Sequence, residues 1–364
     1  MKIAHVQVKP IMSGAQQISY EILSSLALEG HDLYLICADF GDESIDFVDK
    51  FNELGVSILT VSSLKRELGF HDFKVITDLY KIFKKYNFDV VHTNSTKPGI
   101  FARIAAKLAG TKKIIHTVHG IAFHNNVNPF VRLAYYLLEN FSTLFGHYNL
   151  SVNKYYRKFY PFVETRTIYN GCDFSKLKPS FQKKINEKIH FAFLGRLDTQ
   201  KNPLEFIKAI YLLSKEVDIN QFKFTIAGDG ELRSDCEDLL KKYKLNNDVI
   251  MYGWVYDKNI FLNTVDVLCQ PSLWEAFGLV FCEAGFFKIP SIAKSVEGIP
   301  EVVLDNQSGL LYSGNAVELK EKMLFCIENP ALIHEYGEKA YEYVTREFTV
   351  DRMVDEYKMI YFQK

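Results

Sequence analysis

Two glutamates stand eight residues apart in WEAFGLVFCEAGF, residues 274–286, a run that is otherwise almost wholly apolar. Glutamate is among the residues least often fully buried, so acids in such a run need a reason. We expect a helix to begin around Phe277, with Glu275 in the loop before it and Glu283 two turns inside. In one continuous helix, eight residues at about 100° each leave the two carboxylates about 80° apart, which does not place them on one solvated stripe. A pair of acids on a solvated helix face is the alternative.

The segments that follow two expected strands could bind phosphate. Gly278 would let a ligand approach the first-turn amides of the helix closely, and such amides attract phosphate oxygens. In FLGRLDTQKNP, residues 193–203, Arg196 and Lys201 lie on a strand-to-helix loop. They could converge on a diphosphate, Arg as a bidentate fork and Lys as a point charge. Two exposed loop charges are the alternative for this pair.

Glycines after two other strands are weaker signals. TIAGDGELR, residues 225–233, runs from a strand into a glycine-flanked turn at Gly228. Its Gly-x-Gly is shorter than the dinucleotide fingerprint G-x-G-x-x-G, so alone it indicates a turn more often than a site. In KPIMSGAQQ, Gly14 follows the first strand and could bring backbone amides against a ligand.

Three histidines fall within HTVHGIAFH, residues 116–124. A metal site is not expected, because His116 would lie within a strand and no Asp, Glu or Cys is near enough to complete a ligand shell. His119, next to Gly120 at the end of the strand, is better placed to touch a substrate. A hydrogen-bonded structural histidine is the alternative.

Two stretches mix aromatic residues with Arg and Lys: NPFVRLAYYLLENFSTLF and NKYYRKFYPF. Such clusters can bind nucleic acid or a membrane surface. An ordinary buried helix whose cations reach out to water is the alternative. No helix-turn-helix, RNA-binding-sheet or zinc-finger pattern is present, so we do not expect a nucleic-acid partner.

The elements that must position these residues alternate between short β-branched runs and helical patterns, which is typical of parallel α/β layers. The pattern restarts after a Lys-rich polar stretch, and 364 residues exceed what one core usually supports. We therefore expect an α/β protein with two Rossmann-like domains whose parallel sheets face a central cleft. The expected parts are an N-terminal domain, a linker that acts as a hinge, a C-terminal domain, and a terminal helix that could pack back towards the first domain: 1–174, 175–188, 189–350 and 351–364.

Charge and cysteine content restrict the compartment and the partners. The formal net charge is −1, but residues 61–170 carry 16 Lys and Arg against 6 Asp and Glu, which favours an anionic partner for the first domain. The six cysteines are scattered without a C-x-x-C pair, as in proteins of reducing compartments. The N-terminus turns polar too soon for a signal peptide, and no stretch is apolar enough to span a membrane. We expect a cytoplasmic protein.

Taken together, these segments resemble the nucleotide-sugar glycosyltransferases of the two-Rossmann-domain (GT-B) type, in particular the large retaining family 4. The resemblance runs over nearly the whole chain. The motifs that carry it, in order, are NG at Asn170–Gly171, GRL…K at Arg196 and Lys201, GDGE at residues 228–231, and E-x7-E at Glu275 and Glu283. The first loop departs from the family, which often has Gly-Gly-Ala where this chain has Ser13-Gly14-Ala15.

The resemblance implies a role for each site residue. Arg196 and Lys201 would hold the donor diphosphate, and Glu275 and Glu283 would contact the donor sugar and the ribose. His119 would lie near the reacting sugar and the acceptor. The implied catalytic residues are His119, Arg196, Lys201 and Glu275. The implied donor-binding residues are Gly14, Arg196, Lys201, Gly228, Glu275, Phe277, Gly278, Leu279 and Glu283, the amides of residues 277–279 adding to the anion site.

The resemblance also implies the substrates and the location. Within family 4, the segment HTVHGIAFH followed by LLEN resembles bacterial enzymes that build capsule, exopolysaccharide or other surface glycans on a lipid carrier. Such enzymes retain anomeric configuration without a fixed protein nucleophile and need no metal. The implied donor is a UDP-sugar, with GDP-mannose as the alternative, and the implied acceptor is a polyprenyl-diphosphate-linked sugar or a glycan. We expect peripheral contact with an anionic membrane at its inner face, through residues within 61–170.

Two other functions fit the same architecture. A sugar-nucleotide epimerase would bind the same donor but would need no acceptor. An inactive partner of a glycan-assembly complex would need none of the four charges Arg196, Lys201, Glu275 and Glu283. An NAD-linked dehydrogenase is not expected, because G-x-G-x-x-G is absent after the first strand.

Overall fold

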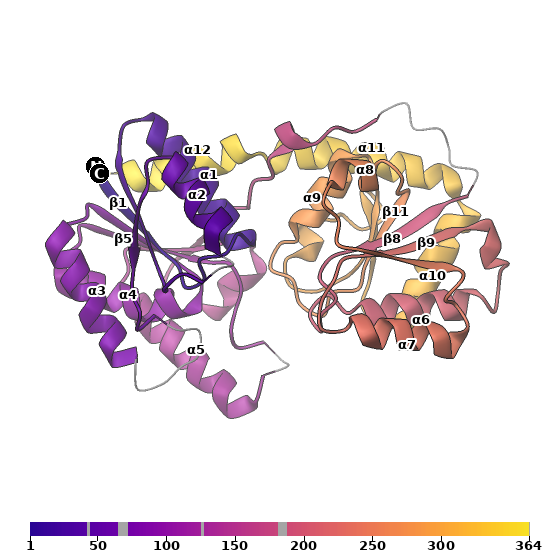
Figure 1. Cartoon of the computed structure of the whole chain (residues 1–364), viewed down its shortest axis with the longest axis horizontal. Helices are drawn as coiled ribbons and strands as arrows, with labels where there is room; N and C mark the ends of the chain where they lie inside the picture. Colours follow the sequence, from indigo (N-terminus) through magenta and orange to yellow (C-terminus); the bar gives the residue numbers. More distant parts are fainter. Residues whose placement is uncertain (42–43, 65–71, 125–126, 181–187, 364) are drawn as a thin grey trace. The chain divides into compact units, whose positions relative to one another are not determined.

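The chain folds into two compact α/β units (Figure 1). The structure, a computed structural model, describes residues 1–41, 44–64, 72–124, 127–180 and 188–363. Unit 1 comprises Met1–Gly171 and Val350–Lys364, and unit 2 comprises Cys172–Thr349. The chain therefore passes from unit 1 to unit 2 and returns for its last helix.

Unit 1 is built on a parallel sheet that has seven strands among the described residues, in the order β3-β2-β1-β4-β5-β6-β7. The strands are β1 (Lys2–Val6), β2 (Asp32–Cys37), β3 (Ser57–Thr60), β4 (Val90–Asn94), β5 (Lys113–Val118), β6 (Tyr148–Ser151) and β7 (Thr165–Thr167). The helices are α1 (Gly14–Leu28), α2 (Ile45–Glu53), α3 (Asp72–Tyr86), α4 (Thr96–Ala109), α5 (Pro129–Thr143) and α12 (Val350–Phe362), with a 3-10 turn, η2 (Tyr155–Phe159).

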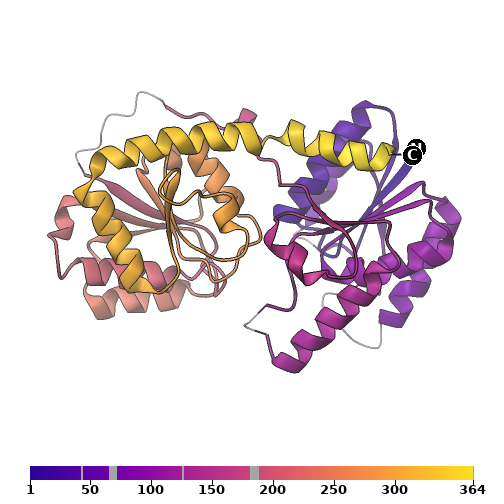
Figure 2. The same ribbon diagram turned by 180° about the vertical axis from the view of Figure 1, so that it is seen from behind.

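The central strands of unit 1 are buried on both faces, as expected for a parallel sheet covered by helices. One face packs its apolar side chains against α1, α2 and α12, and the other packs against α3 and α4 (Figures 1 and 2). The last helix is held by polar contacts as well as by packing. The Tyr361 hydroxyl lies 2.8 Å from His5 Nε2 and also contacts His92 Nδ1, all three side chains being buried.

Unit 2 repeats the arrangement with a parallel sheet that has six strands in the described part, in the order β10-β9-β8-β11-β12-β13. The strands are β8 (His190–Leu194), β9 (Lys223–Ala227), β10 (Val249–Gly253), β11 (Val267–Gln270), β12 (Ser291–Lys294) and β13 (Gly309–Tyr312). The helices are α6 (Pro203–Leu213), α7 (Arg233–Tyr243), α8 (Lys258–Leu262), α9 (Leu279–Phe286), α10 (Ala316–Glu328) and α11 (Pro330–Glu347). The expected pair of Rossmann-like domains with parallel sheets is thus confirmed.

The boundary between the units lies earlier than the sequence pattern suggests. We expected a linker at 175–188, yet its described part lies against α8: the Lys178 amide donates to Asn259 Oδ1 at 2.6 Å, and the Ser180 amide donates to Asn263 Oδ1 at 2.7 Å. Residues 181–187 of the expected linker lie outside the described residues. Side-chain amides from a distant helix fix this segment, and a local composition signal does not reveal them.

Candidate functional site

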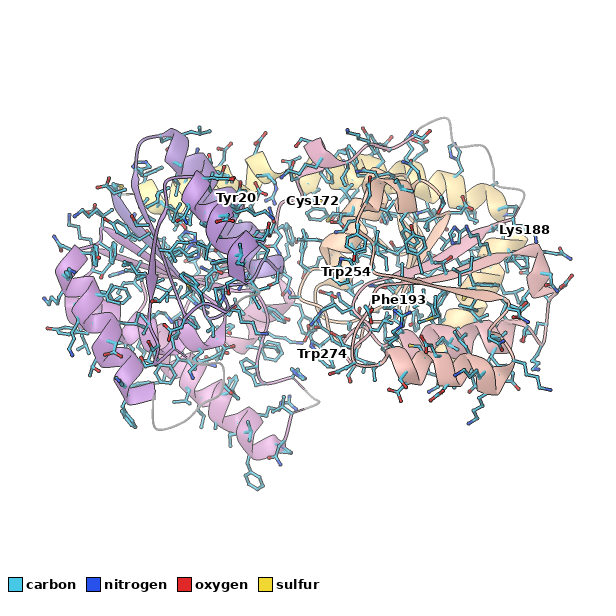
Figure 3. The ribbon with its side chains drawn as sticks, in the orientation of Figure 1. Tyr20, Cys172, Lys188, Phe193, Trp254 and Trp274 are labelled. Carbon is cyan, nitrogen blue, oxygen red and sulfur yellow. The ribbon has the colours of Figure 1, made fainter. Side chains whose placement is uncertain are left out.

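The loops after β8 and β11 meet where the strand order of unit 2 reverses. The Leu273 amide donates to the Gln200 carbonyl at 2.8 Å, and Gln200 Nε2 donates to the Trp274 carbonyl at 3.0 Å. Figure 3 labels Trp274 in the second loop and Phe193 in β8. Ligands of open parallel sheets bind outside the carboxyl ends of the strands at this reversal point. This edge of the sheet is the candidate site of unit 2.

Lys201 and Glu275 form an ion pair across these two loops. Their side chains retain 15% and 12% of their exposure, so both charges are largely withdrawn from water. The Lys201 amide donates to Asp198 Oδ1 at 2.9 Å, which shapes the turn before α6. Burying an ion pair costs desolvation free energy, so such a pair adds little net stability. The position of this pair at the reversal point therefore favours a role in binding. The alternative of an exposed loop charge is wrong for Lys201.

Arg196 shares the same loop but lies in solvent. Its guanidinium is 3.0 Å from Asp198 Oδ2 and donates to Gln200 Oε1 at 3.2 Å, while the side chain is 63% exposed. The Asp198 carboxylate therefore contacts both expected cations, the guanidinium of Arg196 and the backbone amide of Lys201. Asp198 was not predicted, although an acid between two expected phosphate ligands is a readable signal.

Gly228 allows the loops after β8 and β9 to pack backbone against backbone. Its φ is +136°, and a Cβ there would lie 1.8 Å from the Gly195 carbonyl oxygen. The Leu197 amide donates to the Asp229 carbonyl at 2.9 Å in the same contact. The structure thus gives Gly228 a packing role that holds the Arg196 loop in place.

The helix after β11 begins later than expected. Gly278 is the N-cap of α9 with φ +81°, and the first helical residue is Leu279. A helix start at Phe277 is therefore wrong: Phe277 precedes the cap, and its buried ring packs edge-on against Phe348 at 5.1 Å. First-turn amides have no intrahelical partner, so the amides that could bind an anion at this helix start belong to Leu279 and Val280 rather than to Phe277. Val280 was missed because the left-handed turn at Gly278 is not visible in the sequence.

Both glutamates are paired with lysines and largely buried. Glu283 lies in α9 with 14% of its side chain exposed, and its Oε1 is 2.6 Å from Lys258 Nζ. Glu275 lies outside the helix, so the angle calculated for one continuous helix does not apply. The solvated-face alternative is also wrong, because each acid has a cationic partner from another element.

Two polar side chains at the end of β11 were also missed. Gln270 is buried, and its Nε2 donates to the Leu194 carbonyl at 3.0 Å. Within the described part of the chain, Gln270 Oε1 and the buried Ser272 hydroxyl have no hydrogen-bond partner. Buried polar atoms are paired in most proteins, so unpaired ones beside the Lys201–Glu275 pair fit a site that receives a ligand or water. Their signal was a Gln and a Ser directly after an apolar strand.

In unit 1, His119 lies one residue beyond β5 and contacts the end of β4. His119 Nε2 is 3.0 Å from Asn94 Oδ1. Burial lowers the pKa of His119 to about 4, so the imidazole is neutral near pH 7. A neutral ring that donates from Nε2 to this oxygen keeps a lone pair on Nδ1. Strand alternation places the buried Gln7 and Asn94 on the same face of the sheet as His119. Among the residues that the structure describes, the side-chain amide of Gln7 and Asn94 Nδ2 have no hydrogen-bond partner.

His116 has a structural setting. It lies in β5, is buried, and has its Nδ1 3.0 Å from Thr93 Oγ1. Burial, followed by the nearby charge of Arg103, lowers the pKa of His116 well below its usual value. Among the described residues, no three His, Cys, Asp or Glu side chains gather as metal ligands.

A pocket of about 570 Å³ opens at the carboxyl ends of β1, β4 and β5, where the strand order of unit 1 reverses. Ser13 and Ser95 precede α1 and α4, and neither side chain caps its helix. Ser95 has φ 69° and ψ 167°, a conformation that is strained for any residue other than glycine. Gly14 opens α1, and apart from its chain neighbours and its own helix backbone no atom of the described residues lies within 4 Å of a Cβ placed there. The lining residues are Val8, Lys9, Ser13, Ala15, Gln16, Ser95, Thr96, Lys97, Gly120, Ile121, Ala122, Val127 and Tyr135.

This pocket suits an anion, because two helix starts without side-chain caps and two lysines, Lys9 and Lys97, contribute to its wall. Sequence reasoning found Gly14 and His119 nearby but missed Lys9, Lys97 and Ser95. The conformation of Ser95 depends on the turn into α4, and its residue type gives no sign of it.

Two family models match the chain. "Glycosyltransferase Family 4" matches residues 12–176, and "Glycosyl transferases group 1" matches residues 175–343. The Escherichia coli UDP-Gal:alpha-D-GlcNAc-diphosphoundecaprenol alpha-1,3-galactosyltransferase is 32% identical, over 99% of this chain and 96% of that protein. A Campylobacter jejuni alpha-1,4-N-acetyl-D-galactosaminyltransferase, whose named acceptor is a diphosphoundecaprenol-linked sugar, is 28% identical over 85% of this chain and 84% of that protein.

Solved structures share the fold at low identity. Anabaena Alr3699/HepE in complex with UDP has a TM-score of 0.82 at 17% identity, covering 98% of each chain. WaaG, a glycosyltransferase involved in lipopolysaccharide biosynthesis, has a TM-score of 0.75 at 14% identity, covering 100% of each chain. Because a relative that is 32% identical spans nearly the whole length and both models name the same activity, the chain belongs to the family 4 glycosyltransferases.

Proposed function

We propose that this glycosyltransferase moves a sugar from a UDP-sugar to a polyprenyl-diphosphate-linked acceptor in surface-glycan synthesis. The observation that carries the proposal is the largely buried Lys201–Glu275 pair at the reversal point of unit 2, beside the start of α9. The name of the Escherichia coli relative supports UDP-galactose as the first donor to test and GlcNAc-diphosphoundecaprenol as the first acceptor. These relatives give no support to the epimerase or to the inactive partner.

In this proposal, unit 2 holds the donor. Arg196 and Lys201 bind the diphosphate together with the amides of Leu279 and Val280, and they stabilise the charge that grows on the departing UDP. Glu275 accepts hydrogen bonds from the donor sugar, and Glu283 accepts them from the ribose. The pairing of each acid with a lysine holds both carboxylates in position before the donor arrives.

Unit 1 holds the acceptor in this proposal. The lysines and helix starts of its pocket bind the acceptor diphosphate, and His119 contacts the acceptor sugar. As the bond from the anomeric carbon to the phosphate oxygen breaks, the acceptor hydroxyl oxygen bonds to that carbon from the same face. The hydroxyl proton passes to the departing phosphate, so the products are UDP and the extended lipid-linked glycan with retained configuration. His119 stays neutral throughout, which agrees with its lowered pKa.

In this proposal the protein needs no metal ion and works at a membrane surface. The protein works without a metal ion, because cations and helix amides neutralise the phosphates, and it works at the inner face of the membrane as a peripheral protein. No helix in the described part of the chain is long and apolar enough to cross a membrane. Transfer that persists in EDTA would support activity without a metal ion, and loss of activity that Mg²⁺ restores would refute it.

The test of the function combines binding and transfer. We expect UDP-galactose or UDP to raise the melting temperature, with about 2.7 kcal/mol of added stability at 100 times the dissociation constant. Radiolabelled galactose should pass to the lipid acceptor in the wild type and in Lys208→Ala. Lys208 is an exposed lysine on α6, so this variant is the matched control for Lys201→Ala. Formation of an epimerised sugar nucleotide without acceptor would favour the epimerase. Absence of any nucleotide shift would favour the inactive partner.

A further inference from the structure

Helix α5 has its polar residues inside and its apolar residues outside. A surface helix normally turns its apolar stripe to the core. The buried residues of α5 are Glu139, Asn140, Ser142 and Thr143. Its exposed large apolar residues, with the capping Leu144, are Phe130, Val131, Leu133, Leu137, Leu138, Phe141 and Leu144. The alternative of an ordinary buried helix is wrong for this segment.

Hydrogen bonds fix this orientation. Arg103, buried in α4, donates from Nη2 to Ser142 Oγ at 2.6 Å. The Tyr160 hydroxyl donates to the Glu139 carboxylate, and Asn140 Nδ2 donates to the Phe159 carbonyl at 3.0 Å. Turning the helix to bury its leucines would leave these buried polar groups unpaired, at a cost of about 1–3 kcal/mol for each neutral group and more for a charged one. The outward apolar side is therefore a fixed property of the unit.

Five of these exposed residues form one continuous stripe along the helix, which we call the apolar stripe: Phe130, Leu133, Leu137, Phe141 and Leu144. Their spacing of three and four residues places them within about 80° of one another around the helix axis. Phe130 at the start of the stripe is 84% exposed. Phe162, which follows η2, is 73% exposed. Figure 1 shows α5 on the outside of unit 1, and Figure 3 shows side chains along it that point away from the sheet.

The charge around the stripe is positive. From residue 90 to residue 163 the chain has nine Lys and Arg and a single acid, Glu139, which is buried. Arg157 and Lys158 lie in η2, which the Asn140–Phe159 hydrogen bond ties to α5. Both are exposed. Exposed cations beside an exposed apolar stripe match a leaflet that presents anionic headgroups above acyl chains.

We propose that the apolar stripe of α5, flanked by Arg157 and Lys158, docks on an anionic lipid bilayer. The stripe inserts among the acyl chains, and the two cations contact lipid phosphates. A second copy of the chain is a poorer occupant, because a two-fold interface would bring the same cations against each other. Tyr135, on the opposite side of the same helix, lines the pocket of unit 1, so docking holds that pocket one helix diameter, about 10 Å, from the lipid surface. Only this last step rests on the proposed function, through its lipid-linked acceptor.

The test measures co-sedimentation of the full chain with vesicles of phosphatidylcholine, with and without phosphatidylglycerol. The stripe variant is Leu133→Gln/Leu137→Gln. The matched control is Leu28→Gln/Leu108→Gln, which changes two exposed leucines elsewhere on unit 1. We expect the wild type and the control to bind phosphatidylglycerol vesicles, and the stripe variant to bind about tenfold more weakly or worse, because two apolar side chains no longer enter the bilayer. Arg157→Ala/Lys158→Ala should weaken binding at low salt more than at high salt.

Two results would overturn the docking surface. One is a wild type that stays in the supernatant with every vesicle. The other is a wild-type dimer that the stripe variant dissociates, since the stripe would then be an interface between copies. Transfer to a water-soluble, short-chain acceptor separates this inference from the proposed function. The stripe variant should keep that activity and lose activity on acceptor held in vesicles. Vesicle binding without transfer to any acceptor would refute the proposed function and leave the docking surface standing.

Discussion

Replacing Lys201 with alanine tests whether the ion pair with Glu275 serves structure, chemistry or both. The two side chains come from loops 74 residues apart in the sequence and meet at the reversal point of unit 2. Removal of the lysine leaves the Glu275 carboxylate largely buried without its cation. It also removes a positive charge from the proposed diphosphate site.

The stability effect follows from burial. Breaking a fully buried ion pair costs about 3–5 kcal/mol, because an uncompensated charge stays in the protein. Lys201 and Glu275 keep 15% and 12% of their exposure, so water screens part of the loss. We expect Lys201→Ala to lower the free energy of unfolding by about 2–3 kcal/mol in urea denaturation. We expect the transfer rate to fall about 100- to 1,000-fold, as when one charge-stabilising donor is removed.

The double variant Lys201→Ala/Glu275→Gln separates the two effects. Glutamine has the shape of glutamate without its charge, so it should restore most of the lost stability. It cannot replace the lysine at a phosphate, so transfer should stay at the level of the single variant or below. Both variants would be assayed at saturating donor after circular dichroism has shown that they are folded. Full recovery of transfer in the double variant would refute the role of Lys201 at the diphosphate and reduce it to a partner of Glu275.

Three further expectations follow from single contacts. Gly228→Ala places a Cβ about 1.8 Å from a backbone oxygen at a residue with positive φ, so the free energy of unfolding should fall by more than about 3 kcal/mol. Gly120→Ala, where the described residues leave open space for a Cβ, should change that free energy little in the same urea titration. His119→Ala should lower kcat/KM about 2- to 10-fold, the value of a neutral hydrogen bond of roughly 0.5–1.5 kcal/mol, and equal activity would refute its contact with the acceptor. Burial lowers the pKa of His5 to about 3 and that of His119 to about 4, so their contribution to stability is present above pH 6.5 and is lost as pH falls towards 4. Each histidine should lower the free energy of unfolding by about 1–2 kcal/mol between pH 7 and pH 5. A constant urea midpoint over that range would contradict the burial of both histidines as neutral rings.

The fold could be predicted from the sequence because its signals are local. Runs of β-branched residues mark strands, and parallel strands send their loops to one edge, so Arg196, Lys201 and Glu275 could be assigned to a common site before the structure was known. The return of α12 to unit 1 depends on distant contacts. Met353, Tyr357 and Tyr361 pack on a sheet formed far earlier in the chain. An amphipathic pattern shows only that a helix has an apolar side.

The finer geometry of the site depends on backbone conformations that residue types permit without requiring. Gly278 could occupy a strand, a turn or a helix cap, and its left-handed φ of +81° moved the start of α9 two residues beyond Phe277. Ser95 gives no hint of its positive φ, yet its turn helps to form the pocket of unit 1. The sequence pattern therefore indicated which loops meet at the carboxyl ends of the strands, but it gave no sign of the particular amides or of several of their neighbours.

The side of helix α5 that is buried also could not be predicted from the sequence of the helix. Its sequence contains an apolar stripe, from Phe130 to Leu144, and a polar side that includes Glu139. Hydrophobicity alone would turn the stripe inwards, because burying each leucine or phenylalanine is worth about 1.5–3 kcal/mol. The buried Arg103 reverses the choice: it needs polar partners, and α5 supplies them through Ser142 and the Glu139 carbonyl. One buried cation on α4 thus determines which side of α5 meets the surroundings, and replacing Arg103 with leucine should weaken both the packing of α5 and the binding to anionic vesicles.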